Sequence, residues 1–194
     1  MSSDRTILCL DLALANTGVA VIALDSPDRL VFVETLQTVK LSKDILKKLK
    51  LKVADDEWAR VGQLVTKLEE VIAKYAPSHI FIECPTGGSK SAQAAKSMAL
   101  ARGAACATTR FYNIPVTLVS PFAAKKAATG EAKASKEQVK NVAKTLFPDF
   151  TAWVTGKRGK VVEGKNEHVY DALSVYVAAK LTKEYKDLKN VGSK

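Results

Sequence analysis

Apolar and polar positions alternate along the first third of the chain in blocks that predict antiparallel strands. The apolar run Ile7 to Leu10 ends at Asp11, and a second apolar run, Val19 to Ile22, begins after Asn16-Thr17-Gly18. This pattern predicts a β-hairpin that carries an acid at the end of its first strand. A turn at residues 25–28 and a third strand from Leu30 to Leu36 complete an antiparallel meander.

The next segment predicts a helix followed by a buried strand. Apolar residues recur with the 3.6-residue period over 55–75, which places Trp58 in the core, and Pro77 ends the helix. The run Ile80-Phe81-Ile82 then leads directly to Glu83. A short, wholly apolar run is typical of a buried parallel strand, and this one delivers a second acid at its carboxyl end.

The remaining half predicts further helices around one short strand. We expect an Ala-rich helix over 91–112, a strand over 115–119, a short helix opened by Ser120 and Pro121 and ended by Gly130, and a helix from the capping box at Ser135 to Leu146. Residues 148–166 are predicted to be a loop, 167–185 the last helix and 186–194 a frayed basic tail. The fold class is therefore α/β, a mixed sheet with helices on both faces, in one domain over 1–185.

The charge of the chain predicts a nucleic-acid partner. Thirty Lys and Arg against twenty Asp and Glu give a net charge of +10. The excess is clustered in three segments, Lys40 to Lys52, Lys125 to Lys144 and Lys157 to Lys165, the first of which has six lysines and one acid. Such clusters suit a phosphate backbone, whose neutralisation releases counterions. A solvated lysine surface is the alternative.

Hydropathy and cysteine usage predict a soluble, cytoplasmic protein with no membrane partner. No apolar run approaches the roughly 20 residues that span a bilayer, and the N-terminus lacks the pattern of a signal peptide. Cys9, Cys84 and Cys106 stand singly in apolar stretches. We expect them to be buried free thiols of a reducing compartment, and we expect no zinc site.

Four residues form a candidate catalytic set. Asp11 and Glu83 end apolar runs, and His168 and Asp171 are spaced i and i+3 in the last predicted helix, so they share one face. Such ligands suit Mg²⁺ or Mn²⁺, and two such ions about 3.5–4 Å apart activate water and stabilise a leaving oxygen. Each residue also has a purely structural interpretation. Asp11 would be a turn former and Glu83 an exposed strand end. His168 would be an exposed first-turn histidine and Asp171 an acid at a helix N-terminus. A basic protein with clustered acids has the composition of a nuclease.

The same residues lie in segments that resemble the RuvC family of Holliday junction resolvases, over residues 7–177. The segments are ILCLDLALANTGVAV with Asp11, IFIEC with Glu83 followed by LARGAA, the run from Lys125 to Gly130 continuing into Ser135-Lys-Glu-Gln-Val, and His168-Val-Tyr-Asp171-Ala-Leu. A single segment of this kind would be weak support. Four in the order of the family are a specific match.

The resemblance implies a ribonuclease H-like fold and the activity of a crossover junction endodeoxyribonuclease. Such an enzyme works as a homodimer that nicks two opposed strands of a four-way junction symmetrically and leaves 5′ phosphates. By this resemblance Asp11, Glu83, His168 and Asp171 bind two Mg²⁺ or Mn²⁺ ions, with Asp11 between them. The lysines expected to contact DNA are Lys90, Lys125, Lys126 and Lys136, of which Lys125 and Lys136 match functionally important lysines of the family.

Two departures from the family pattern keep alternatives open. Leu12-Ala13 stands where the family commonly has Pro-Gly, and Thr86 stands where some members place an aromatic residue that stacks on junction bases. A less selective nuclease for branched or flap DNA, or a non-catalytic structure-selective DNA-binding protein, therefore remains an alternative. An actin-like or sugar-kinase ATP-binding fold needs a much longer chain. Residues 155–166 are either a DNA-contacting flap or a variable loop, and a cellular or viral source is open.

Overall fold

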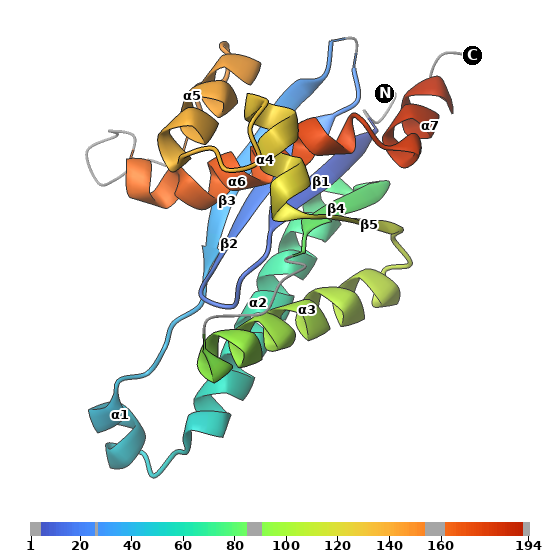
Figure 1. The fold of residues 1–194 in the computed structure, drawn as a ribbon. Coiled ribbons are helices and arrows are strands. Elements are labelled where there is room, and N and C mark those ends of the chain that lie inside the picture. Colours follow the sequence, from blue (N-terminus) through green and yellow to red (C-terminus); the bar gives the residue numbers. More distant parts are fainter. Residues whose placement is uncertain (1–4, 26, 85–90, 154–161, 192–194) are drawn as a thin grey trace.

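The computed structural model describes residues 5–25, 27–84, 91–153 and 162–191, which form a mixed sheet and its covering helices (Figure 1). The elements in chain order are β1 (Thr6–Asp11), β2 (Asn16–Ala23), β3 (Arg29–Gln37), α1 (Lys43–Lys48), α2 (Val53–Tyr75), β4 (His79–Glu83), α3 (Ala92–Phe111), β5 (Val116–Val119), α4 (Pro121–Thr129), α5 (Lys136–Leu146), α6 (Glu163–Ala179) and α7 (Lys183–Val191).

The sheet has the strand order β3-β2-β1-β4-β5. Strands β1, β2 and β3 pair antiparallel, whereas β4 pairs parallel with β1 and with β5. The predicted fold class is therefore confirmed. Because β3 runs in the same direction as β1 and β4, the carboxyl ends of these strands lie at one end of the sheet, and Asp11 is in register with Glu83 on one side and Gly18 on the other.

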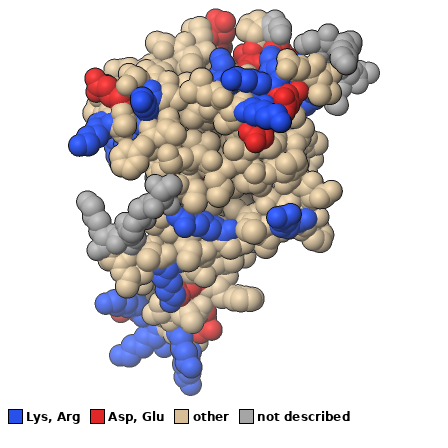
Figure 2. All heavy atoms as spheres, turned by 45° about the vertical axis from the view of Figure 1, so that its right-hand side comes forward, with Lys and Arg blue, Asp and Glu red and all other residues tan. Residues whose placement is uncertain are grey.

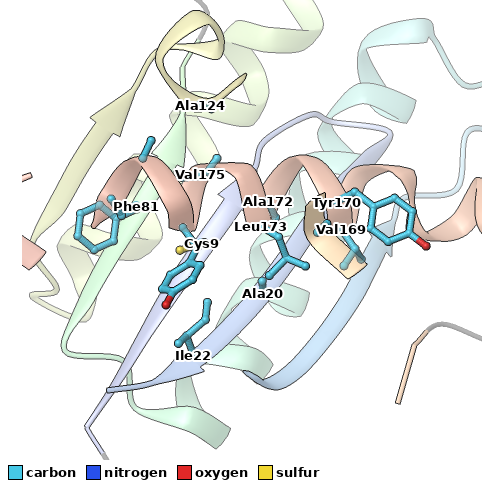
Figure 3. Packing of buried hydrophobic residues seen from close by; sticks show 14 of the residues in the cluster. Cys9, Ala20, Ile22, Phe81, Ala124, Val169, Tyr170, Ala172, Leu173 and Val175 are labelled. Atoms are coloured by element: carbon cyan, nitrogen blue, oxygen red, sulfur yellow. The ribbon is translucent and has the colours of Figure 1, made fainter. Parts of the chain in front are cut away.

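Alternation along the strands sends successive side chains to opposite faces, and each face has its own apolar core. Cys9 and Phe81 pack with Leu173 of α6 and with residues of α4 and α5 (Figure 3). Leu8 and Leu10 pack on the other face with residues of α2 and α3. Asp11 continues the Cys9 side of β1, so the acid emerges on the face that α6 covers.

Most helix ends lie where the capping residues in the sequence predicted them. Ser135 and Gln138 form the expected capping box of α5, and the Ser120 hydroxyl accepts from the Ala123 N–H at the start of α4. Gly130 ends α4 with a φ of 82°, a left-handed conformation that favours glycine. Among the described residues, no helix combines the length and apolar character needed to cross a bilayer.

The C-terminal segment differs from the prediction. Helix α6 begins at Glu163 and ends at Ala179, and residues of the expected frayed tail up to Val191 belong to α7. The cause is a polar cluster beside Asp28, whose carboxylate accepts from the Tyr176 hydroxyl at 2.8 Å, from the Tyr185 hydroxyl and from the Lys189 ammonium at 2.7 Å. These contacts hold α7 against the turn between β2 and β3.

The predicted hairpin is present, and its turn occupies residues 12–15, so Asn16-Thr17-Gly18 is the start of β2. Other expectations were wrong. Cys106 is exposed because it lies on the outer side of α3, while Cys9 is buried as predicted and Cys84 is half-buried. Trp58 is 83% exposed because α2 extends beyond the sheet and its first turns bury charged residues instead. Helix α1 lies within the lysine cluster from Lys40 to Lys52, for which no helix was predicted.

Candidate active site

Two neighbouring strands bring Asp11 and Glu83 together. The apolar runs of β1 and β4 are buried side by side, and both strands end at these acids, which are paired residues of the parallel ladder. Parallel strands with matched ends place consecutive carboxylates next to each other at the sheet's carboxyl edge. The sequence prediction that each acid ends a strand is therefore correct.

Helix α6 supplies the other two predicted residues. The His168 Nδ1 lies 2.8 Å from the Asp11 Oδ2. Asp11, His168 and Asp171 each place one ligand atom within 4.8 Å of those of the other two. His168 and Asp171 share a helix face because they are one turn apart. The structure thus unites three of the four predicted residues in one cluster, with Glu83 beside it on β4.

Gly18 allows α6 to approach the sheet closely enough for this contact. A Cβ atom added to Gly18 would lie 1.9 Å from the His168 carbonyl oxygen, far inside van der Waals contact. Gly18 is also the β2 partner of Asp11 in the ladder. A residue without a side chain at this position therefore sets the distance between His168 and Asp11.

Burial and mutual repulsion dominate the electrostatics of the acids. Burial, followed by the negative charges of Asp11 and Asp171, raises the pKa of Glu83 to about 8. Burial and Asp11 raise the pKa of Asp171 to about 6, against the opposing effects of Lys125 and His168. The hydrogen bond to Asp11 raises the pKa of His168. Among the described residues, Lys125 opposes the rise at both acids but does not cancel it.

The donor set fits a divalent cation. Carboxylate oxygens are the preferred ligands of Mg²⁺ and Mn²⁺, and an imidazole nitrogen shifts the preference toward Mn²⁺. The Asp11 carboxylate orients His168 as an outer partner orients a ligating histidine. A cation placed among Asp11, His168 and Asp171 would also relieve the repulsion that raises the pKa values of Glu83 and Asp171.

The predicted lysines are distributed unevenly around the cluster. Lys125 of α4 is half-buried and close enough to lower the pKa of both Glu83 and Asp171. Lys136, the first residue of α5, forms an ion pair with Glu167 of α6. Lys126 is exposed on α4, and Lys90 lies outside the described residues. Lys125 and Lys136 therefore lie near the acids.

Sequence reasoning missed Glu167 as a partner of this site. The ion pair raises the pKa of Lys136 and lowers that of Glu167. Its only local signal is the position of Glu167 directly before His168, which does not identify a lysine 31 residues away as its partner. The segment 155–166, for which a DNA-contacting flap and a variable loop were both open, lies outside the described residues up to position 161, and from Glu163 onward it is helix α6.

The fold is shared with solved resolvase structures. The Thermus thermophilus RuvC structure in complex with a Holliday junction substrate has a TM-score of 0.65 and 20% identity, with 90% of this chain and 92% of that chain covered. The yeast mitochondrial Holliday junction resolvase has a TM-score of 0.58 and 16% identity, with 97% and 83% covered. The sheet order and the acids at its carboxyl edge thus define an α/β protein of the ribonuclease H-like class.

The chain belongs to the RuvC family, because the sequence profile described as "Crossover junction endodeoxyribonuclease RuvC" matches residues 7–152. Relatives named crossover junction endodeoxyribonuclease RuvC include one from Rickettsia felis, which is 30% identical over 146 residues, or 75% of this chain and 85% of the relative. The family resemblance inferred from the sequence is therefore confirmed.

The match is shorter for two other relatives of the same name. The Porphyromonas gingivalis protein is 32% identical over 91 residues, which are 47% of this chain and 48% of that protein. The Christiangramia forsetii protein is 29% identical over 139 residues, or 72% and 66%. The chain thus spans about half to two thirds of the length of these two relatives.

Proposed function

We propose that this protein is a metal-dependent endonuclease that hydrolyses phosphodiesters in four-way DNA junctions by symmetric paired nicks. The observation that carries the proposal is the convergence of Asp11, His168 and Asp171 within 4.8 Å, beside Glu83, in a chain of the RuvC family. The basic charge of the chain, +10, matches a polyanionic substrate.

Asp11, Glu83, His168 and Asp171 would hold the metal ions, which we propose to be two Mg²⁺ or Mn²⁺ per site. Bound there, such ions would lower the pKa of a water molecule and stabilise negative charge on the leaving oxygen. The donor chemistry of the four residues supports this assignment. The expected homodimer would supply one such site for each of the two opposed strands.

His168 has a defined orientation in this proposal. An ionised Asp11 only accepts hydrogen bonds, so the proton of a neutral His168 lies on Nδ1 and is donated to Asp11 Oδ2. The lone pair of Nε2 is then available to bind a cation or to accept a hydrogen bond from the attacking water. The water oxygen forms a bond to phosphorus as the bond to the 3′ oxygen breaks, leaving a 3′ hydroxyl and a 5′ phosphate.

The lysines around the cluster would position the scissile strand. Lys125 lies beside Glu83 and Asp171, so its ammonium is placed to meet a phosphate oxygen that approaches these acids. Lys136, Lys126 and Lys90 would extend the contact along the backbone. Glu167 holds Lys136 next to the cluster until a phosphate competes for it.

The test is cleavage of a labelled mobile four-way junction and a matched linear duplex with Mg²⁺, with Mn²⁺ and with chelator. We expect paired nicks across the junction that disappear with chelator and are absent on the duplex. Binding of the junction without cleavage under any metal condition would overturn the proposal.

A less selective nuclease for branched and flap DNA is the second candidate function. The residue three positions after Glu83 is Thr86, which offers no ring for a junction base to stack on. Three-way junctions and flaps added to the same assay separate the two candidates. Equal rates on all branched substrates would favour the broader activity.

A further inference from the structure

One exposed, basic segment has no part in the site described above. Residues 39–58, which we name the lysine arm, comprise the exit from β3, helix α1 and the first turns of α2. They extend beyond the sheet (Figure 1). All six lysines of the arm are exposed, and between Lys40 and Lys52 they are accompanied by one acid, Asp44. Figure 2 shows blue side chains gathered at this lower end of the molecule.

The arm starts at the catalytic end of the sheet. Asp11 pairs with Gly18 of β2, which in turn pairs with Thr35 of β3, so these residues form one row across the sheet. Strand β3 ends at Gln37, and the arm begins two residues later. DNA with a phosphate at Asp11 would therefore extend past the end of β3, which we call the root of the arm.

Polar contacts hold this root in place. The Thr38 hydroxyl donates to the Leu14 carbonyl at 2.6 Å, in the loop that follows Asp11, and accepts from the Arg60 Nε at 3.0 Å. The Asp56 carboxylate accepts from the Leu41 N–H at 2.8 Å. Arg60 and Asp56 are both buried in α2, so the arm has a fixed origin beside the loop that follows Asp11.

The same contacts direct Trp58 outward. Asp56, Glu57 and Arg60 occupy the inner side of the first turns of α2, and Glu57 forms an ion pair at 2.5 Å with Lys96 of α3. Trp58 is left 83% exposed. Other exposed apolar residues of the arm are Val39, Ile45, Leu49, Leu51 and Val53. A run of lysines that is followed in the same segment by an exposed aromatic ring is a pattern of surfaces that bind unpaired nucleic acid.

We propose that the lysine arm is a second DNA-contact surface of this protein, in which its lysines neutralise backbone phosphates and the Trp58 indole stacks on an unpaired base at the branch. The inference rests on the proposed function in that the substrate is branched DNA. Two observations favour DNA over a lipid or protein surface: the run of six lysines with one acid between Lys40 and Lys52, and the origin of the arm at the sheet end that carries Asp11 and Glu83.

The lysine contribution is tested by comparing two double variants of equal charge. Lys47→Gln/Lys48→Gln removes two charges from the arm, whereas Lys183→Gln/Lys186→Gln removes two exposed charges from α7. Helix α7 lies at the opposite end of the sheet, where Arg5 donates to the Leu188 carbonyl. Junction affinity is measured with chelator, which prevents cleavage, over a range of salt concentrations. We expect the arm variant alone to lower the salt slope by about 1.8, or about 0.9 per phosphate contact.

The aromatic contribution is read from Trp58 itself. In a Trp153→Phe background Trp58 is the one remaining tryptophan, and we expect junction binding to quench its fluorescence more strongly than duplex binding does. Trp58→Ala should weaken junction binding roughly 5- to 100-fold, whereas Trp58→Phe should retain most of the affinity. The melting temperature of each variant should match that of the wild type, because the ring is exposed.

The outcomes separate the arm from the proposed function. Quenching and the Trp58→Ala loss in a protein that cuts no junction would overturn the proposed nuclease and support the arm. Full cleavage and unchanged junction affinity in Lys47→Gln/Lys48→Gln and in Trp58→Ala would overturn the proposal that the lysine arm contacts DNA. An equal loss in the α7 control would also overturn it, as would Trp58-dependent self-association or binding to anionic vesicles without any effect on DNA affinity.

Discussion

Two groups of acids on opposite faces of the sheet behave in opposite ways. On α2, Asp56 accepts from a backbone N–H and Glu57 pairs with Lys96, which lowers the pKa of Glu57. At the carboxyl edge of β1 and β4, burial and neighbouring acids raise the pKa of Glu83 to about 8 and that of Asp171 to about 6. Acids of both groups lie at one end of the molecule, yet within the described part of the chain Glu57 has an ion-pair partner of its own, whereas Glu83 and Asp171 have none.

This contrast separates a structural role from a ligand-binding role. A buried acid with its own donor stabilises the fold, since the contact favours the charged form. Acids that face one another without such partners cost stability, and they are retained where a cation is bound. Partner identity distinguishes the two roles better than burial does, because residues of both groups are largely buried.

The largest expected effect is that of Asp11→Asn. Removing the carboxylate that contacts His168 and neighbours Glu83 should lower junction cleavage by about 10³-fold or more, since metal-assisted charge stabilisation is worth several kcal/mol. Junction affinity measured in chelator should change by less than about threefold. The matched control is Asp187→Asn on α7 at the opposite end of the sheet, which should cleave normally.

The assignment of the cluster would be wrong if Asp11→Asn retained full activity. Wild-type activity of Asp11→Asn together with loss in Asp187→Asn would move the catalytic role away from the cluster. Either result is read directly from rates of junction cleavage under single-turnover conditions.

Gly18→Ala is expected to have the next largest effect. Its new methyl group would meet the His168 carbonyl 1.9 Å away, so α6 must shift. Overpacking of this kind costs about 1–3 kcal/mol, which corresponds to a fall in melting temperature of roughly 2–12 °C, and cleavage should fall at least tenfold. The control is Gly62→Ala on α2, where an added Cβ meets nothing within 4 Å. That variant should be as stable as the wild type or more so.

A Gly18→Ala protein with normal stability and normal cleavage would contradict the close approach of α6 to β2. Loss of cleavage with unchanged melting temperature would instead show that α6 moves without any cost to the fold. Circular dichroism melts and junction cleavage of the two glycine variants, made side by side, distinguish these results.

Local sequence patterns predicted the parts of the site that depend on neighbouring residues. The apolar runs before Asp11 and Glu83 identified both strand ends, and the spacing of His168 and Asp171 gave one helix face. The capping box of α5 and Gly130 fixed helix ends in the same way. That these elements meet at one point followed from the family resemblance, because pairing of β1 with β4 spans about 70 residues of chain.

Features set by distant contacts escaped prediction. The period of α2 assigned Trp58 to the core on the assumption that the whole helix packs on the sheet, but its first turns lie beyond the sheet edge. The limit on side-chain size at Gly18 depends on α6, about 150 residues later in the chain. The partner of Glu167 is likewise set by the packing of α5 against α6.

The third prediction compares Glu83→Gln with Glu57→Gln in chelator. The folded-state pKa of Glu83, about 8, is above its ordinary value of 4.5, so the wild type loses stability as pH rises through that window. The lowered pKa of Glu57 has the opposite sign: it adds stability above 4.5 that is lost as pH falls through the lowered value. At pH 8.5 we therefore expect Glu83→Gln to raise the melting temperature and Glu57→Gln to lower it.

The expected size for Glu83→Gln follows from a shift of well over one pKa unit, each unit being worth about 1.4 kcal/mol, so the melting temperature should rise by at least roughly 3–6 °C. At pH 5 the difference in melting temperature between Glu83→Gln and the wild type should shrink. Glu83 is then protonated in the folded protein and is uncharged, like the glutamine that replaces it. A Glu83→Gln protein that melts below the wild type at pH 8.5 would show that Glu83 has a stabilising partner, like Glu57.

The smallest effect is expected at the ion pair between Glu167 and Lys136. Lys136 is largely exposed, and such pairs contribute about 1 kcal/mol or less, so Glu167→Gln should lower the melting temperature by no more than about 4 °C. Because Glu167 competes with phosphate for the ammonium, Glu167→Gln should tighten junction binding at low salt by a few fold, whereas Lys136→Gln should weaken it. The double variant should bind like Lys136→Gln, since without the lysine the acid has no charge to compete for. Weaker binding in Glu167→Gln would mean instead that the acid holds Lys136 in its DNA-binding position, which would make this exposed pair resemble the structural acids of α2.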